Sequence, residues 1–227
     1  PQPVKFFTIG PIFRHDRPQA GRFREFRQVG FEVLGSQAPV VDAELIAIAC
    51  FLFRECGLDY SLQINSLGCP NCRPNYRAVL IDYFRGVKNK LCVTCRKRLT
   101  KNPFRILDCK EPSCVSLSQD VPPMVDHLCE DCRKHFTKVL EHLDEVEIPY
   151  TLNHRIVRGL DYYTKTTFEI FPVIAGEEDA GSQSALCGGG RYDDLTELLG
   201  GRPTPASGFA IGVERIILKI KEKNILL

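Results

Sequence analysis

The first candidate for chemistry is an arginine-rich stretch, FRHDRPQAGRFREFRQ, which places five arginines between Phe13 and Gln28. Arginine stays charged at any accessible pH, and crowding like charges is costly unless an anion lies among them. Strand-like sequence on both sides, with Pro and Gly between, predicts a β-hairpin. Arg14 and Arg22 would then present guanidinium groups to phosphate, and Phe26 an aromatic face to a purine. The alternative is a basic hairpin that binds RNA.

A second candidate is a set of paired cysteines. Eight of the eleven cysteines form four pairs between residues 69 and 132. Because we find no secretory signal peptide, these pairs favour a metal over disulfides. Eight thiols suit two four-cysteine zinc sites, with three ways of matching the pairs. An iron–sulfur centre is a minor alternative, and so is an insert that folds without metal. The candidate ligands are Cys69, Cys72, Cys92, Cys95, Cys109, Cys114, Cys129 and Cys132.

The cysteine-bearing segment also carries an excess of positive charge. Residues 69–135 hold 13 Lys+Arg against 7 Asp+Glu, whereas the whole chain has a net charge of only +2. A charge run is usually a solvated surface, but a patch of this density is also what a phosphate backbone requires of its partner. The segment is therefore a candidate contact for nucleic acid.

Apolar periodicity places these candidates on an α+β fold. We expect an antiparallel sheet flanked by helices, built by residues 1–68 and 150–227 and interrupted by a mainly helical insert at 69–149. Asp42 is predicted to cap a helix that ends at Gly57. No apolar run approaches ~20 residues, so we expect no membrane span and a cytoplasmic protein. Strands are predicted at 4–14, 25–35, 60–68, 150–159, 162–174 and 184–190, helices at 73–87, 125–146 and 192–200, and a strand entering a helix at 207–223.

Four motifs give the chain a specific resemblance. FRHD…RFREF resembles motif 2 of class II aminoacyl-tRNA synthetases, and GFAIGVERI at 208–216 resembles their motif 3. VRGLDYYT at 157–164 and LCGGGRYDDL at 186–195 resemble the two sequences peculiar to histidyl-tRNA synthetases. The four motifs stand in the family's order, with an insert after motif 2, and together they span nearly the whole chain. The resemblance implies a catalytic region that makes histidyl-adenylate from L-histidine and ATP and passes the histidine to tRNA(His).

The resemblance also implies roles for single residues. Arg14 and Arg158 would contact the α-phosphate and Arg215 the far end of the triphosphate, so these three are the candidate catalytic residues, with Mg²⁺ on the outer phosphates. Asp16 stands where motif 2 more often has glutamate. The implied ATP-binding residues are Arg14, Asp16, Arg22, Phe26 and Arg215. The implied histidine-binding residues are Gln28, Glu32, Arg158, Tyr162, Tyr163, Gly189 and Tyr192. The implied tRNA contacts are Arg96, Lys97, Arg98, Lys101 and Arg105.

By the same resemblance, motif 1, which forms the interface of a homodimer in this family, would precede Pro1, and an anticodon-binding domain would follow Leu227. Two other classes of function remain open. A non-catalytic relative, such as a histidine-biosynthesis subunit or a tRNA sensor, would keep the fold but would be expected to lose phosphate-binding arginines. A zinc-stabilised RNA-binding module would explain the basic insert, but it would leave VRGLDYYT and motif 3 unexplained.

Overall fold

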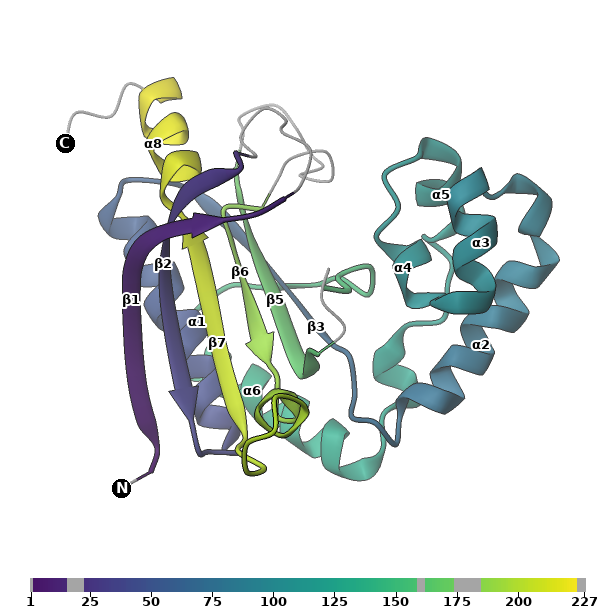
Figure 1. Ribbon diagram of the computed structural model, residues 1–227, viewed down its shortest axis with the longest axis horizontal. Helices are drawn as coiled ribbons and strands as arrows, with labels where there is room; N and C mark the ends of the chain where they lie inside the picture. The colour runs from purple at the N-terminus through teal and green to yellow at the C-terminus, as the bar shows by residue number, and fades with distance from the viewer. Residues whose placement is uncertain (1, 16–22, 159–161, 174–184, 224–227) are drawn as a thin grey trace.

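A seven-stranded sheet forms the centre of the molecule (Figure 1). The computed structural model describes residues 2–15, 23–158, 162–173 and 185–223. Neighbouring strands in the order β1-β2-β7-β6-β5-β3-β4 are antiparallel, except that β4 pairs parallel with β3. The α+β class predicted from the sequence is confirmed. The strands are β1 (Val4–Phe13), β2 (Glu25–Leu34), β3 (Tyr60–Ser66), β4 (Thr151–Leu152), β5 (Thr164–Pro172), β6 (Cys187–Arg191) and β7 (Ala206–Gly212).

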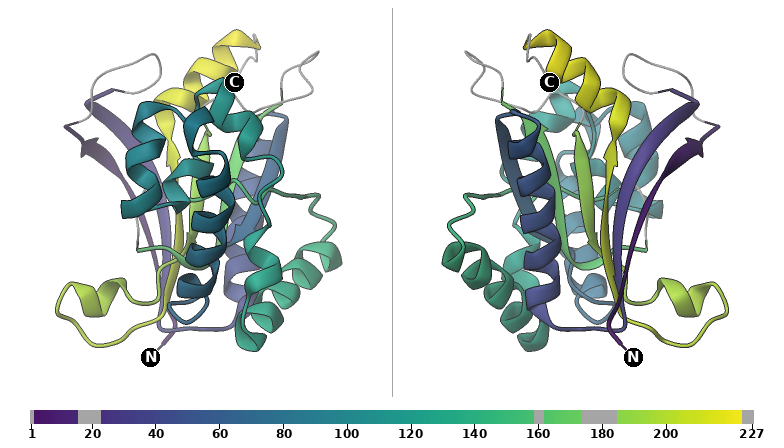
Figure 2. Two further views of the ribbon diagram at one scale, coloured as in Figure 1. Left: turned by 90° about the vertical axis from the view of Figure 1, so that its right-hand side faces the viewer. Right: turned by 90° about the vertical axis from the view of Figure 1, so that its left-hand side faces the viewer.

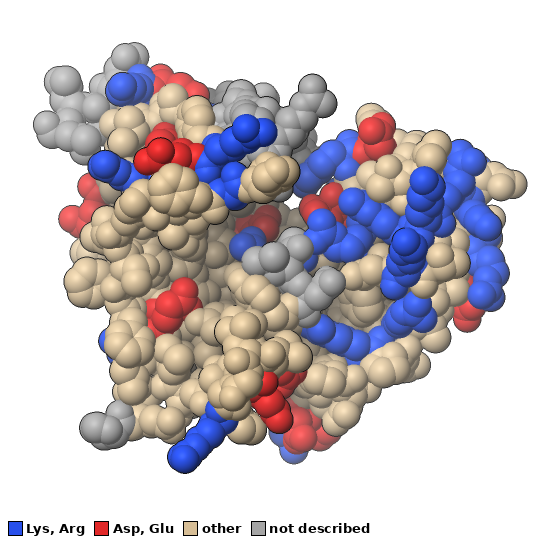
Figure 3. Space-filling view, in the orientation of Figure 1, with Lys and Arg blue, Asp and Glu red and all other residues tan. Residues whose placement is uncertain are grey.

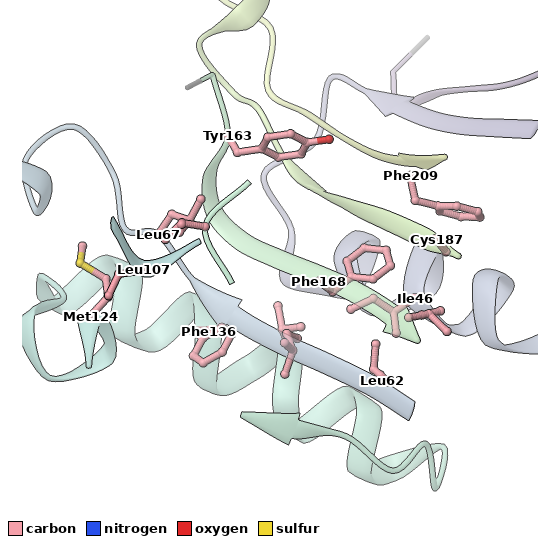
Figure 4. Packing of buried hydrophobic residues seen from close by; sticks show 14 of the residues in the cluster. Ile46, Leu62, Leu67, Leu107, Met124, Phe136, Tyr163, Phe168, Cys187 and Phe209 are labelled. Atoms are coloured by element: carbon pink, nitrogen blue, oxygen red, sulfur yellow. The ribbon is translucent and has the colours of Figure 1, made fainter. Parts of the chain in front are cut away.

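The two faces of the sheet differ because side chains alternate along each strand. One face packs against α1 (Pro39–Glu55) and α6 (Glu130–Glu145), which also contact each other. Figure 4 shows Phe168 of the sheet next to Ile46 of α1, with Phe209, Leu62 and Phe136 of α6 in the same buried cluster. The opposite face of β6 and β7 carries mainly glycine and alanine, so it is shallow and leaves room for a ligand.

A group of short helices lies to one side of the sheet (Figure 2, left). Its longest helix, α2, buries Tyr76, Leu80 and Phe84, which recur every four residues and so share one face. None of the helices in the described ranges is long and apolar enough to cross a membrane. The elements of this group are α2 (Arg73–Gly86), η1 (Lys88–Lys90), α3 (Val93–Lys101), α4 (Phe104–Leu107), α5 (Pro112–Leu117) and η2 (Met124–His127).

Several predicted elements differ from the structure, and the helix predicted at 125–146 is divided into η2 and α6. Helix α1 begins at Pro39 after Ala38, so Asp42 lies inside its first turn and is buried, where it bonds other side chains and does not cap the helix. Of the strand predicted at 150–159, the described residues 150–158 form a strand only at Thr151–Leu152. The strand stops because the Asn153 side chain accepts a hydrogen bond from the backbone of Arg155 at 2.9 Å, which turns the chain.

The last two helices follow the final strands. The helix predicted at 192–200 is the single turn α7 (Leu195–Leu198). Helix α8 (Val213–Glu222) continues directly from β7, at the end of the sheet where the β1–β2 hairpin closes (Figure 1). This end of the sheet therefore brings the hairpin arginines close to motif 3.

Candidate active site and cysteine clusters

A carboxylate on β2 lies at the centre of the shallow face. Glu32 pairs across the sheet with Gly208 of β7, which in turn pairs with Gly190 of β6. A Cβ atom built on Gly208 would lie only 1.6 Å from Oε2 of Glu32. Glycine at 208 is therefore what allows the Glu32 carboxylate to lie over the neighbouring strand.

Three tyrosines stand around this carboxylate. The Tyr192 hydroxyl donates a hydrogen bond to Glu32. The rings of Tyr162 and Tyr163 are stacked with centroids 4.7 Å apart, and Tyr192 meets Tyr163 edge-on at 6.3 Å. Burial raises the pKa of Glu32, and the Tyr192 hydrogen bond opposes that shift only in part. The arrangement is an aromatic box with one hydrogen-bonding carboxylate, suited to a small planar ring that carries N–H groups.

Arg158 lies beside the box. Its guanidinium carbon is 5.2 Å from the centroid of the Tyr163 ring, and its Nη1 donates to Glu169 at 2.5 Å. A Cβ on Gly188 would come within 2.2 Å of the same Nη1, so glycine makes room for the cation. Burial opposes the charge on Arg158, but Tyr163 and Glu169 raise its pKa above the usual arginine value. The site thus holds a permanent positive charge next to the box.

The hairpin end of the face holds a second group of residues. The Arg14 guanidinium lies 4.2 Å from the centroid of the Phe26 ring, and its Nε donates to the Phe23 carbonyl at 2.7 Å. Arg215, in the first turn of α8, donates to the Ala185 carbonyl. Six residues separate Phe26 from Glu32 along β2, a span of about 20 Å at roughly 3.3 Å per residue. A nucleotide and a small amino acid fit end to end in that length.

The predicted site residues are distributed as follows. Gln28 lies between the two groups and pairs with Gly212 of β7. Gly189 belongs to the opposite face, because a Cβ there would meet Phe209 at 2.6 Å, whereas its neighbours Gly188 and Gly190 face the site. Asp16 and Arg22 lie outside the described residues. The structure therefore brings together Glu32, Arg158, Tyr162, Tyr163 and Tyr192 around the box, and Arg14, Phe26, Gln28 and Arg215 along the hairpin end.

The eight paired cysteines form two separate clusters. In each cluster all four sulfur atoms lie within 4.8 Å of one another. We call Cys69, Cys72, Cys129 and Cys132 the neck cluster, because it joins the two ends of the helical group, and Cys92, Cys95, Cys109 and Cys114 the distal cluster. The structure thus selects one of the three possible matchings of the pairs.

The sulfur spacing identifies what the clusters can hold. Cys69 Sγ lies 3.7 Å from Cys72 Sγ and 3.9 Å from Cys129 Sγ, and Cys92 Sγ lies 3.9 Å from Cys109 Sγ. Disulfide sulfurs would be about 2.05 Å apart. Four sulfurs placed at about 2.3 Å from one zinc ion in a tetrahedron are about 3.8 Å from one another. The distances are those of a tetrahedral metal site.

Backbone N–H groups favour the thiolate form in the neck cluster. Burial alone would raise the pKa of Cys69, but hydrogen bonds from the backbone of Cys72 and Asn71 lower it to about 7. The backbone of Cys129 donates to Cys72 Sγ at 3.2 Å. These donors stabilise negative charge on sulfur, which is the form that binds metal, although burial still raises the pKa of Cys72 above its usual value.

Comparison with known proteins agrees with the motifs. Residues 116–216 match the family model described as histidyl-tRNA synthetase. The histidine–tRNA ligase of Pelotomaculum thermopropionicum is 52% identical over 226 residues, which cover 99% of this chain and 52% of that protein. The chain belongs to the histidyl-tRNA synthetase family.

Other members give the same result. The histidine–tRNA ligase of Desulfitobacterium hafniense is 49% identical over 96% of this chain and 50% of its own length. The structure of apo S. aureus histidyl-tRNA synthetase superposes with a TM-score of 0.75 at 36% identity and covers 100% of this chain and 53% of that one. An ATP phosphoribosyltransferase regulatory subunit/histidyl-tRNA synthetase from Bacillus halodurans, 20% identical with a TM-score of 0.62, shares the fold. The chain spans about half the length of the curated relatives it matches.

A basic cleft separates the helical group of this synthetase-family chain from the sheet. Its volume is about 520 Å³, and its lining includes Arg73, Arg77, Lys101, Arg105 and Arg158, with no carboxylate among the lining residues that the structure describes. Figure 3 shows Lys and Arg side chains gathered over the helical group and along its border with the sheet. The cleft leads from the basic surface to the active site, because Arg158 belongs to both.

The five predicted tRNA residues divide between this cleft and the outer surface. Lys101 and Arg105 line the cleft. Arg96 and Lys97 are exposed on α3, and Arg98 donates to the Arg105 carbonyl at 2.9 Å. Arg73 and Arg77, which also line the cleft, were missed from the sequence. Their spacing of four residues, directly after a cysteine pair, is the one signal that could have indicated them.

Proposed function

We propose that the protein containing this chain activates L-histidine with ATP and transfers it to tRNA(His). The observation that carries the proposal is the box of Glu32, Tyr163 and Tyr192 beside a buried arginine. It occurs in a chain about half identical to histidine–tRNA ligases. The alternative of a regulator is not favoured, because Arg14, Arg158 and Arg215 are all present. An RNA-binding module alone would have no use for the box.

Histidine recognition follows from the chemistry of the box. Neutral imidazole has one N–H donor and one acceptor nitrogen, so it must be met by an acceptor on one side and a donor on the other. The Glu32 carboxylate accepts the ring N–H, and the rings of Tyr162, Tyr163 and Tyr192 enclose the imidazole faces and edge. Gln28, further along β2, binds the α-amino group. Phenylalanine or leucine would leave the partly buried Glu32 carboxylate without the ring N–H donor, which is the basis of selectivity.

Activation places charge near two arginines. A carboxylate oxygen of histidine attacks the α-phosphorus of MgATP, a P–O bond forms, and the bond to the leaving pyrophosphate breaks. Negative charge grows on the α-phosphate oxygens, where Arg14 and Arg158 stabilise it. Arg215 holds the outer phosphates and Phe26 contacts adenine, with Mg²⁺ entering as part of the nucleotide. A ribose hydroxyl at the 3′ end of tRNA then attacks the acyl carbon and releases AMP.

The basic cleft supports tRNA as the second partner. Lys101 and Arg105, together with Arg73, Arg77 and Arg158, line a path about 520 Å³ in volume between the helical group and the box. A cleft lined by several cations suits a phosphate backbone. Arg96, Lys97 and Arg98 extend the same charge along α3 and contact the acceptor stem. Asp16 and Arg22 retain their proposed roles in ATP binding.

Each cysteine cluster binds one structural zinc ion in this proposal. The sulfur spacing fits a tetrahedron, and four thiolates with no open position make a closed, non-catalytic site. Elemental analysis of protein purified without chelator is expected to give two zinc ions per chain. Absence of metal, with all eight paired thiols titrating freely in the folded protein, would contradict it.

The complete protein is proposed to be a cytoplasmic homodimer. Strand β1 is at the sheet edge and exposes Phe7, Ile9 and Phe13 on one face, each about 70% accessible. An apolar edge of this kind is normally covered in the assembled protein. Residues 1–68 and 150–227 are proposed to form the catalytic core and 69–149 the insertion domain.

Histidine-dependent exchange of pyrophosphate into ATP tests the proposed function. The complete protein is expected to exchange with histidine and to remain inactive with the other amino acids. Exchange that does not depend on histidine, or that is absent from folded protein, would contradict the proposal. Charging of a tRNA(His) transcript tests the second step separately.

A further inference from the structure

The neck cluster is connected to the histidine box by one arginine. Cys72 precedes α2, and Arg73, the first residue of that helix, donates from its Nη2 to the backbone carbonyl of Tyr163. The bond spans 90 residues of sequence and joins the helical group to the start of β5. A charged donor on a carbonyl fixes the backbone from which the Tyr163 ring projects.

A second connection comes from the two residues before Cys69. The Lys165 N–H donates to the Gly68 carbonyl at 2.8 Å, and the Leu67 N–H donates to the Lys165 carbonyl at 2.7 Å. Lys165 has a φ of 48°, a left-handed conformation that a residue with a Cβ adopts only when its surroundings enforce it. Lys165 stands two residues after Tyr163. The chain entering the neck cluster therefore holds the bulge at the start of β5.

A third connection runs through α6 to the other side of the box. Cys132 and His135 lie one turn apart on this helix, and both are buried. His135 Nε2 lies 2.9 Å from Oδ2 of Asp42, whose Oδ1 accepts from Arg191 at 2.7 Å. Arg191 is fully buried and immediately precedes Tyr192. One turn of α6, the buried contacts from His135 through Asp42 to Arg191, and the peptide bond to Tyr192 thus join the neck cluster to the residue that holds Glu32.

We propose that the neck cluster supports the histidine box, with Arg73 and His135 as its positioning residues. Arg73 directly follows Cys72 and donates to the backbone of Tyr163. His135 lies three residues after Cys132 and acts through Asp42 and Arg191 on the segment that carries Tyr192. The inference rests on the proposed function, because it assigns the neck cluster to histidine binding. It adds that a four-cysteine cluster in the insert positions the walls of the histidine box.

The distal cluster provides the contrast. It joins α3 to α4 and α5 within the helical group, and the backbone of Cys92 donates to Cys114 at 3.3 Å. Arg85, in the last turn of the same helix as Arg73, is exposed and pairs with Asp82 at 3.4 Å, and it does not line the cleft. Arg85 is therefore a control for Arg73, with the same charge on the same helix.

The test compares Arg73→Gln with Arg85→Gln in the complete protein. Arg73→Gln is expected to raise the KM for histidine about tenfold in pyrophosphate exchange and to leave the KM for ATP within about twofold. Arg85→Gln is expected to change neither value by more than about twofold. Arg73→Lys, which keeps one charged donor, is expected to recover part of the histidine affinity.

Calorimetric titration with histidine alone supplies a readout that does not depend on turnover, and elemental analysis confirms that each variant keeps its metal. An unchanged histidine KM in Arg73→Gln, or an equal rise in Arg85→Gln, would overturn the inference while leaving histidine activation intact. Absence of exchange in the unsubstituted protein would instead overturn the proposed function and the inference with it.

Discussion

The neck and distal clusters each offer four cysteine ligands, but they contact different parts of the molecule. The neck cluster closes a loop of 57 residues between Cys72 and Cys129 and contacts the chain that enters β5, whereas the distal cluster closes 22 residues between Cys92 and Cys114 within the helical group. Identical ligand chemistry can thus serve two purposes, and the position of a cluster in the chain decides which. In the proposed function, the neck side of the molecule binds histidine and ATP, and the distal side presents charge to tRNA.

The largest expected effect is a loss of pyrophosphate exchange on the neck side, caused by substitution of Arg158. Arg158→Ala removes the charge next to the box, and pyrophosphate exchange is expected to fall about 100-fold or more with little change in the KM for ATP, because the arginine acts on charge that develops in the transition state. The measurement is steady-state exchange at saturating histidine. A near-normal rate would remove Arg158 from the catalytic residues.

Gly208→Ala is expected to damage histidine binding next most strongly. A methyl group at 208 would overlap the Glu32 carboxylate, which lies 1.6 Å from the Cβ position. The carboxylate must move away from the ring N–H, so the KM for histidine is expected to rise roughly 10- to 100-fold, the range for a lost hydrogen bond to a charged group. Gly86→Ala is the control, because a Cβ there meets open space and the backbone is not in the left-handed region. Equal KM values in the two variants would contradict the placement of Glu32.

The clusters are expected to differ in their contribution to stability. Loop closure alone favours the neck cluster by about 0.8 kcal/mol, from 1.5RT times the logarithm of the ratio of the two loop lengths. Cys129→Ser is therefore expected to lower the unfolding temperature a few degrees more than Cys109→Ser, as followed by circular dichroism. A larger loss in Cys109→Ser would reverse the ranking.

The smallest expected effect lies on the distal side. Replacing Arg96, Lys97 and Arg98 with alanine is expected to weaken tRNA charging several-fold and to reduce its dependence on salt, since fewer counterions are released. Pyrophosphate exchange should stay within about twofold of the unsubstituted rate. A matched loss of exchange would mean that the distal surface also supports the active site.

Local patterns predicted much of this molecule. Alternating and 3.6-residue periodicity located the hairpin and the main helices, and cysteine spacing identified all eight clustered thiols. The matching of the cysteine pairs was not predictable, because it depends on how α3 and α6 fold back in space. The Asp42 prediction was wrong for a related reason, since a buried partner, Arg191, lies 149 residues away and takes the carboxylate that would otherwise cap the helix. The family resemblance assigned Gly189 to the pocket. The sequence alone could not show its face, because none of the three consecutive glycines has a side chain that would indicate which side of the strand it lies on.

Histidine affinity in the two cysteine variants tests the comparison most directly. Calorimetric titration of histidine into folded Cys129→Ser and Cys109→Ser proteins, each checked for loss of one metal, measures the box without catalysis or tRNA. The neck variant is expected to bind histidine about tenfold more weakly than the unsubstituted protein, and the distal variant to bind with unchanged affinity. Equal affinities in the two variants would contradict the division of the molecule into a neck that serves the histidine box and a distal half that serves tRNA.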